Sequence, residues 1–238
     1  MKRHFIAQLI LLFSMVSTSC IYAGGEDVVK QTRTVVPFSQ LKVSSGITVI
    51  LSSGMQQEVV VEAADATIDN VSTVVEDGVL AVFLQSSRGW FFRHKQGQVK
   101  VYITFTNLTK LEVSSGSTAE SAQALDIPML VVKCSSGAST DLELYCNHLK
   151  LNASSGADIV VRGRGDFVKA VASSGSSVNA YGFKSIDAEV GASAGGSVDL
   201  FADGTVKARA SSGGSVNIRG NGRIKEMNQS SGGSIQKK

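Results

Sequence analysis

Three carboxylates in the middle of the chain could perform acid–base chemistry on a polysaccharide. Glu120, Asp141 and Asp158 follow one another at intervals of roughly twenty residues. Glycoside hydrolases use two carboxyl groups as general acid and as base or nucleophile, so Asp141 with Asp158, or Asp141 with Glu120, is a candidate pair. No histidine lies beside them, and acidic residues at such spacing also occur on the solvated face of a repeat protein. We therefore assign no catalytic residue, and keep a polysaccharide-acting β-helix enzyme as the alternative function.

A polar and aromatic cluster at residues 88–95 is the second candidate for chemistry. It contains the only tryptophan of the chain, Trp90. Aromatic side chains beside arginine suit contact with a glycan, a lipid surface or a protein. The alternative is that these aromatic rings fold back onto the protein and stabilise it. The candidate binding residues are Arg88, Trp90, Phe91, Phe92 and Arg93.

The three cysteines allow more than one outcome. Cys20 lies in the N-terminal leader, whereas Cys134 and Cys146 lie close together in the second half of the chain. An exported chain permits a disulfide between the latter two, but two separate buried thiols are an equal alternative. No third or fourth ligand lies nearby, so we expect no metal site, and nothing indicates a cofactor.

Residues 1–23 are expected to be a signal peptide. Lys2, Arg3 and His4 form a basic start, an apolar run follows at 5–16, and Ala23 precedes a suitable cleavage point. A rival cleavage before Cys20 would leave a lipid anchor on that cysteine. Either route predicts export to the periplasm, the outer membrane or the cell surface. The remaining chain is close to neutral, which gives no indication of nucleic-acid binding.

One tripeptide returns throughout the second half of the chain. Ser-Ser-Gly, or a close variant at 193–195, recurs at a nearly constant interval of about twenty residues. A fixed period of this length with short β-type segments between the copies is typical of a β-solenoid. The predicted structural corners are Ser114, Gly116, Ser135, Gly137, Ser154, Gly156, Ser173, Gly175, Ser211, Gly213, Ser230 and Gly232.

The residues on both sides of each tripeptide alternate between apolar and polar. In one unit, Leu151 and Ala153 precede the corner on one face, and Ile159 and Val161 follow it. This period of two predicts strands with one face inward. Glycine would supply an unusual backbone conformation and room for the neighbouring coils, and the serine hydroxyl could bond the backbone or the next serine. The fold class is therefore all-β, a β-solenoid with coils of about 19–20 residues.

The first half of the chain departs from this period. A first coil is expected at 41–51, and the next unit begins only at Leu111. Strands are predicted at 58–63, 71–76, 79–84 and 99–105, which we expect to form an antiparallel cap on one end of the solenoid. The predicted organisation is a linker at 24–32, the first coil and cap at 33–110, and the repeat solenoid at 111–238, the last two forming one domain.

Several of these segments together resemble a known family. The sequence Leu-Lys-Val-Ser-Ser-Gly at 41–46, followed by the patterns at 58–63, 75–82, 99–104 and 111–116, is similar to the putative auto-transporter adhesin, head GIN domain family of exported bacterial proteins. The resemblance covers residues 33–235. It implies a β-solenoid, a cell-envelope location and adhesion, and it implies no catalytic residue. Thr48 stands where the family often has aspartate.

These observations favour a non-enzymatic envelope protein, either an adhesin-like binding module or a structural one. Its partner would be a glycan or a protein at the cell surface, and a homo-oligomer is compatible with the sequence. A solenoid presents long rows of outward side chains to such a partner. One predicted row contains Glu120, Asp141, Asn179, Asp199 and Asn217. A second row, expected to be structural, contains Thr118, Ser139, Asp158, Ser177, Ser197, Ser215 and Ser234.

Overall fold

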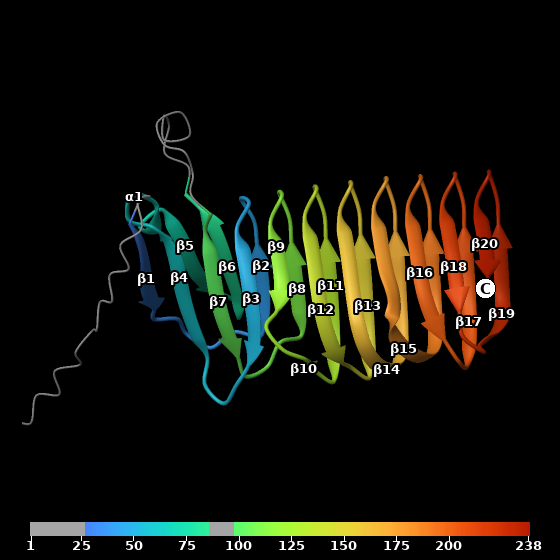
Figure 1. The fold of residues 1–238 in the computed structure, drawn as a ribbon, viewed down its shortest axis with the longest axis horizontal. Coiled ribbons are helices and arrows are strands. Elements are labelled where there is room, and N and C mark those ends of the chain that lie inside the picture. Colours follow the sequence, from blue (N-terminus) through green and yellow to red (C-terminus); the bar gives the residue numbers. More distant parts are fainter. Residues whose placement is uncertain (1–26, 86–97) are drawn as a thin grey trace, which may run out of the picture.

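The protein is a β-solenoid built from two facing sheets, as a computed structural model of residues 27–85 and 98–238 shows (Figure 1). Each rung contributes one strand to each sheet, and the rungs follow one another in chain order through the second half of the molecule. The predicted fold class is confirmed. The helix within the described residues is the single turn α1 (Asp65–Ile68), and none is long enough to cross a membrane.

The N-terminal part contains seven strands besides α1. Their bounds are β1 (Val28–Arg33), β2 (Gln40–Val43), β3 (Thr48–Ser53), β4 (Glu58–Ala64), β5 (Val71–Glu76), β6 (Val79–Leu84) and β7 (Lys100–Phe105). The strands predicted at 58–63, 71–76, 79–84 and 99–105 match β4 to β7 within a residue.

The repeats form the remaining strands. Their bounds are β8 (Lys110–Val113), β9 (Thr118–Ser121), β10 (Leu125–Asp126), β11 (Met129–Cys134), β12 (Ser139–Tyr145), β13 (His148–Ala153), β14 (Asp158–Ala172), β15 (Ser177–Ala192), β16 (Ser197–Ala202), β17 (Thr205–Ala210), β18 (Ser215–Arg219), β19 (Arg223–Gln229) and β20 (Ser234–Lys237). Strands β14 and β15 are long enough to serve both sheets.

We name the two sheets by their place relative to the corners. The first sheet carries the strand that enters each corner, namely β2, β8, β11, β13, the second halves of β14 and β15, β17 and β19. The second sheet carries the strand that leaves it, namely β3, β9, β12, the first halves of β14 and β15, β16, β18 and β20. All these pairings are parallel, so equivalent residues of successive rungs lie side by side.

The core between the sheets consists of columns of aliphatic side chains, one residue per rung. Alternate side chains of every strand point inward, which places them in these columns. One column of the first sheet, in which every member is at most 2% exposed, contains Leu41, Leu111, Val132, Leu151, Ala170, Val190 and Ala208. Side chains in this column become smaller toward the C-terminal rungs, which narrows the interior there.

The tripeptides form the corners, along the upper edge in Figure 1. The second and third residues of all eight triplets, counting 44–46, have positive φ, for example 54° at Ser115 and 70° at Gly116. At Ser117 the backbone N–H donates back to the Ser114 carbonyl at 3.2 Å. Two central residues with positive φ and a bond from the fourth residue to the first are the pattern of a type I′ turn.

A ladder of hydrogen bonds joins each corner to the next. The glycine N–H of one triplet donates to the carbonyl of the second residue in the following triplet, as from Gly116 to Ser136 at 3.1 Å. Seven such bonds, each 3.1–3.2 Å long, connect the eight corners without a gap. The backbone therefore makes the stacking bonds that were expected in part from serine hydroxyls.

Glycine at the corner is required for its conformation and not for space. An added Cβ at Gly116, Gly137 or Gly156 would meet nothing within 4 Å, so the expectation that these residues leave room for adjacent coils is wrong. Other glycines are crowded, among them Gly163 and Gly165 within β14 and two that directly follow a triplet. A Cβ at Gly196 or Gly214 would lie 2.4–2.5 Å from backbone atoms of Ala172 or Ala192.

The N-terminal cap is antiparallel, as predicted. Strand β4 pairs antiparallel with β7, β1 with β4, and β5 with β6. Strands β6 and β7, however, stack in parallel on β2 and β3, so the chain turns back to build a rung outside its first coil. The expectation of a linker at 24–32 is not met in full, because Val28–Arg33 forms strand β1. The backbone of β1 pairs with β4 along the edge of the cap.

Polar side chains close the C-terminal end of the solenoid. At inward positions of the last rung, Gln229 Nε2 donates to the Ile235 carbonyl at 3.3 Å, and Lys237 Nζ donates to the Gly222 carbonyl at 2.6 Å. The rung before it carries the aliphatic residues Ala210 and Ile218 at these positions. Polar groups at the end of a stack disfavour pairing with another copy.

The two cysteines are separate buried thiols, so the disulfide alternative is wrong. Cys134 ends β11 next to a corner, whereas Cys146 follows β12 at the opposite edge of the same coil. The strand between them spans roughly 20 Å, far more than a disulfide can bridge. Burial raises the pKa of both thiols to about 11.

We expect Gly214→Ala to destabilise the fold more than Gly156→Ala. The first change forces a Cβ into the backbone of Ala192 and should lower the free energy of unfolding by about 3 kcal/mol. The second places alanine at a φ of 69° with open space around it, which costs about 1–2 kcal/mol. Urea unfolding of both variants measures the difference, and the reverse order would contradict the assignment of crowded and uncrowded glycines.

Neither thiol should react with Ellman's reagent in the folded protein at pH 8. With a pKa of about 11, about one thiol in a thousand is ionised at that pH, and both side chains are buried. Protein that begins at residue 24, and therefore lacks Cys20, should release close to two equivalents of thionitrobenzoate from Cys134 and Cys146 in guanidinium chloride. Two unreactive cysteines under denaturing, non-reducing conditions would indicate a disulfide instead.

Candidate functional site

The outward side of the first sheet is rich in cations, and we call it the lysine face. Its outward positions near the corners hold seven cations and three carboxylates, the latter being Glu112, Glu189 and Glu226. The cations come from six of the seven successive strands that begin at β2 and end at β17. They are Lys42, Lys110, Lys133, Lys150, Lys169, Lys207 and Arg209.

Parallel register places these charges in two rows along the solenoid axis. Strand spacing separates neighbouring rungs by about 4.8 Å. Lys150 lies directly beside Lys169 in the pairing of β13 with β14. Like charges on directly paired residues destabilise a sheet, and the ion pair of Lys169 with Glu189 offsets part of this cost.

The carboxylates of the lysine face are already engaged with some of its cations. Glu112 accepts from both Lys110 at 2.7 Å and Lys133 at 3.4 Å. Glu189 pairs with Lys169 at 2.7 Å, and Glu226 pairs with Arg209 at 2.9 Å. Within residues 27–85 and 98–238, this face has no further ion pair. The ammonium groups of Lys42, Lys150 and Lys207 have no carboxylate partner among the described residues.

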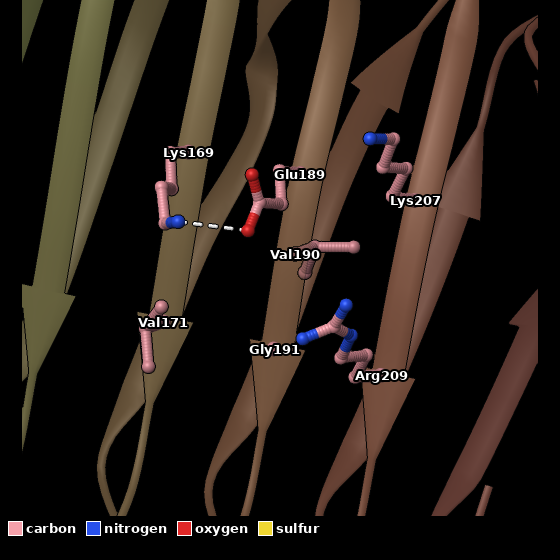
Figure 2. A pocket seen from close by; sticks show the side chains of 7 residues that line it. All are labelled: Lys169, Val171, Glu189, Val190, Gly191, Lys207 and Arg209. Atoms are coloured by element: carbon pink, nitrogen blue, oxygen red, sulfur yellow. Dashed lines mark hydrogen bonds and ion pairs between the residues drawn. The ribbon is translucent and has the colours of Figure 1, made fainter. Parts of the chain in front are cut away.

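A hollow of about 210 Å³ interrupts the lysine face at Gly191. Gly191 occupies an outward position between Val171 on one side and Arg209 on the other, and it has no side chain to fill that place. Lys169, Glu189 and Lys207 stand in the adjacent row, on the same three strands, as Figure 2 shows. The hollow is therefore bordered by three cations and one carboxylate.

The carboxylate at the hollow is held in its charged form. The hydrogen bond from Lys169, together with the charges of Lys169, Lys207 and Arg209, holds the pKa of Glu189 below its ordinary value. Above that pKa, Glu189 neutralises Lys169, and Glu226 on β19 neutralises Arg209 in the same way. Lys207 is then the remaining cation at the hollow. Among the described residues, no carboxylate forms an ion pair with it.

The outward side of the second sheet carries the predicted acidic row, and polar neighbours bond to two of its carboxylates. Asp141 pairs with Arg162, and Asn217 Nδ2 donates to Asp199 Oδ1 at 2.8 Å. The row expected to be structural does the same: Ser177 donates to Asp158, and the hydroxyls of its first two members lie 3.2 Å apart. These contacts engage part of the charge on this open surface, which also carries the cations Arg164, Lys184 and Arg219.

The candidate catalytic pairs lie on this open sheet. Asp141 is beside Glu120 in the pairing of β12 with β9, but Asp158 is paired with Ser139 and so lies in the neighbouring row. The hollow on the opposite face is lined by one carboxylate, Glu189. Within the described residues, no three His, Cys, Asp or Glu side chains gather as a metal site would require.

The aromatic candidate site, Arg88, Trp90, Phe91, Phe92 and Arg93, lies outside the described residues. The predicted corner serines and glycines line one edge between the two sheets.

Sequence reasoning did not identify the lysine face. Its signal was present in the alignment of repeats, where one position shortly before the triplet often holds lysine. This position holds Lys110, Lys150, Lys169 and Lys207. The parallel register turns that preference into a row on one surface.

The sequence matches the family described as "Putative auto-transporter adhesin, head GIN domain" over residues 37–222. No curated protein matches the chain.

Solved structures of bacterial proteins have the same fold. A putative adhesin from Bacteroides fragilis aligns with a TM-score of 0.80 at 14% identity, covering 90% of this chain and 98% of that one. A putative adhesin from Parabacteroides distasonis gives a TM-score of 0.70 at 13% identity over 90% and 98%. A putative lipid binding protein from the same species gives 0.64 at 15% identity over 89% and 96%. At these identities the likeness establishes the fold.

Replacing Lys150 with glutamate should stabilise the protein. The change converts the Lys150–Lys169 juxtaposition into an attractive pair on the same two strands, worth about 0.5–1 kcal/mol. Thermal unfolding at low salt should show a higher Tm, with Lys150→Gln as the control that removes repulsion without adding attraction. A Tm equal to or below that of the unchanged protein would show that the two lysines do not repel each other.

Proposed function

Since the chain belongs to the family described as "Putative auto-transporter adhesin, head GIN domain", we propose that it is a non-enzymatic, adhesin-like binding protein whose contact surface is the lysine face. The observation that carries this proposal is the unmatched charge of that face. This face holds seven cations but three carboxylates, and Lys150 lies directly beside Lys169, which lowers the stability of the sheet.

The rigidity of the solenoid supports a binding role. Parallel ladders hold the strands of the repeats, β8 to β20, and the corner bonds fix each rung to the next. Outward side chains are therefore presented in a set array, and little backbone order has to be gained when a ligand binds. Preorganisation of this kind raises affinity by lowering the entropy cost of association.

The surface offers less support for the alternative, a polysaccharide-acting enzyme. Two carboxylates must flank a scissile bond in such an enzyme. The carboxylates of the second sheet lie on an open face and bond to neighbours such as Arg162 and Asn217. The hollow at Gly191 has a single carboxylate among the residues that line it.

The proposed site of action is the cell surface or another part of the cell envelope. The basic and apolar leader at 1–23 supports export, and so does membership of an adhesin family. Cleavage after Ala23 would release the protein into the envelope, whereas cleavage before Cys20 would tether it to a membrane by lipid. In both cases the lysine face remains available to a partner.

An array of surface glycans and extracellular proteins tests this function with the purified protein. We expect at least one specific ligand. Acetylation of lysines in its presence should then leave Lys133, Lys150 and Lys207 protected, whereas Lys184 on the second sheet should react as in the free protein. Release of shortened glycans during incubation would support the enzyme alternative, and protection of Lys184 alone would move the contact surface to the second sheet.

A further inference from the structure

We infer that the ligand of the lysine face is a linear acidic polysaccharide that lies along the solenoid axis, with one anionic group seated in the hollow at Gly191. This inference rests on the proposed function and names the chemistry of its ligand. It follows from four features: the sign of the charge, its arrangement in a line, the hollow, and the scarcity of large apolar side chains between the cations.

The charges require an anionic ligand. Carboxylates neutralise only part of the cations on this face, and the described residues supply none for Lys42, Lys150 and Lys207. On the second sheet, Arg162 pairs with Asp141, and Arg164 and Arg219 lie over the rings of Tyr145 and Tyr181, which leaves Lys184, within the described residues, as the cation of this group without such a contact. An anionic partner would therefore select the first sheet over the second.

The arrangement of the cations requires an extended ligand. Register aligns them along seven successive strands, from Lys42 on β2 to Arg209 on β17, a length of about 29 Å at 4.8 Å per strand. Small anions would meet one or two of them at a time. A flexible polymer with repeated negative groups can contact several in succession, and each contact raises the effective concentration for the next.

The hollow at Gly191 can hold one anionic group that projects from the polymer chain toward the sheet. Val171 flanks it on one side, Arg209 on the other, and Lys169 and Lys207 stand above it (Figure 2). Glu189 lies between those lysines and already accepts from Lys169, which leaves Lys207 able to bond an incoming carboxylate or sulfate. Guanidinium and ammonium groups both form charge-assisted bonds with such anions.

The same face is poorly suited to a lipid bilayer. Proteins that lie on a membrane insert large apolar side chains between the headgroups, beside their cations. Within the two rows the outward apolar residues are Val131 and Val171, which are short and half-buried. Met129 is exposed, but it lies at the other end of β11 from the corner, beyond the rows. The rows thus offer charge along a line without an apolar surface that could enter the bilayer.

Binding of alginate, hyaluronan and a neutral dextran to the purified protein tests the inference by calorimetry. We expect the two acidic polymers to bind, dextran not to bind, and the affinity to fall steeply between 50 and 300 mM NaCl because salt screens the contacts. Vesicles containing anionic lipid provide a parallel arm. Binding of those vesicles without binding of either acidic polymer would overturn the inference in favour of a membrane surface.

Two variants locate the contact. Lys150→Gln, Lys169→Gln and Lys207→Gln combined should weaken binding by about tenfold or more, since three charge contacts are removed. The matched control combines Arg164→Gln, Lys184→Gln and Arg219→Gln, which removes three exposed charges from the second sheet. Equal weakening by both triple variants would overturn the assignment to the lysine face.

Gly191→Val separates binding from stability. An added Cβ would meet only Val171 Cγ2 at 4.0 Å, and valine favours a strand, so the variant should unfold at the same temperature or higher. It should also bind at least fivefold more weakly, because the hollow is filled while every charge is kept. Unchanged affinity would remove the hollow from the site.

Failure of this inference can be told apart from failure of the proposed function. If the protein binds a neutral glycan or a protein on the array and ignores alginate and hyaluronan, the adhesin-like role stands and the acidic ligand is wrong. If it binds nothing on the array and no acidic polymer, both proposals fail together.

Discussion

The corner is the constraint on which the rest of the molecule depends. From residue 114 onward each triplet closes a type I′ turn, and seven glycine N–H groups bond to the carbonyl of the following triplet at 3.1–3.2 Å. This bond fixes both the spacing and the register of successive rungs at one edge. Because a strand has a period of two, a slip of one residue would exchange the inward and outward faces, so holding the register at every corner also holds the core.

Register is also what gives the surface its character. Parallel stacking brings equivalent residues of every repeat into a row, and a preference for lysine at one position becomes a line of charge. Lys150 and Lys169 show the cost, since the repeat places them side by side without a carboxylate between them. The acidic row of the second sheet has the same juxtaposition where Asp141 lies beside Glu120, and it is reduced there by the ion pair of Asp141 with Arg162.

The two ends of the solenoid are protected by different means. At the N-terminal end, β4 and β5 run antiparallel to the rung beneath them and β1 covers the edge of β4. At the other end, Gln229 and Lys237 replace aliphatic residues at inward positions and bond to backbone carbonyls. Near this end, Gly196 and Gly214 lie so close to the backbone of the preceding rung that neither has room for a Cβ.

The sequence alone determined the repeat length, the fold class and the inward residues. Strand alternation and the corner turn are local patterns, and every repeat contains both. It also predicted the strands of the cap, although the cap region contains no repeat. It could not decide that β6 and β7 would stack outside the first coil, or whether Cys134 and Cys146 are bridged, since both depend on the path of the chain in space. The lysine face was decided by tertiary structure for the same reason: Lys42 and Lys207 are far apart in sequence, and only the parallel register of the strands between them places both on one surface.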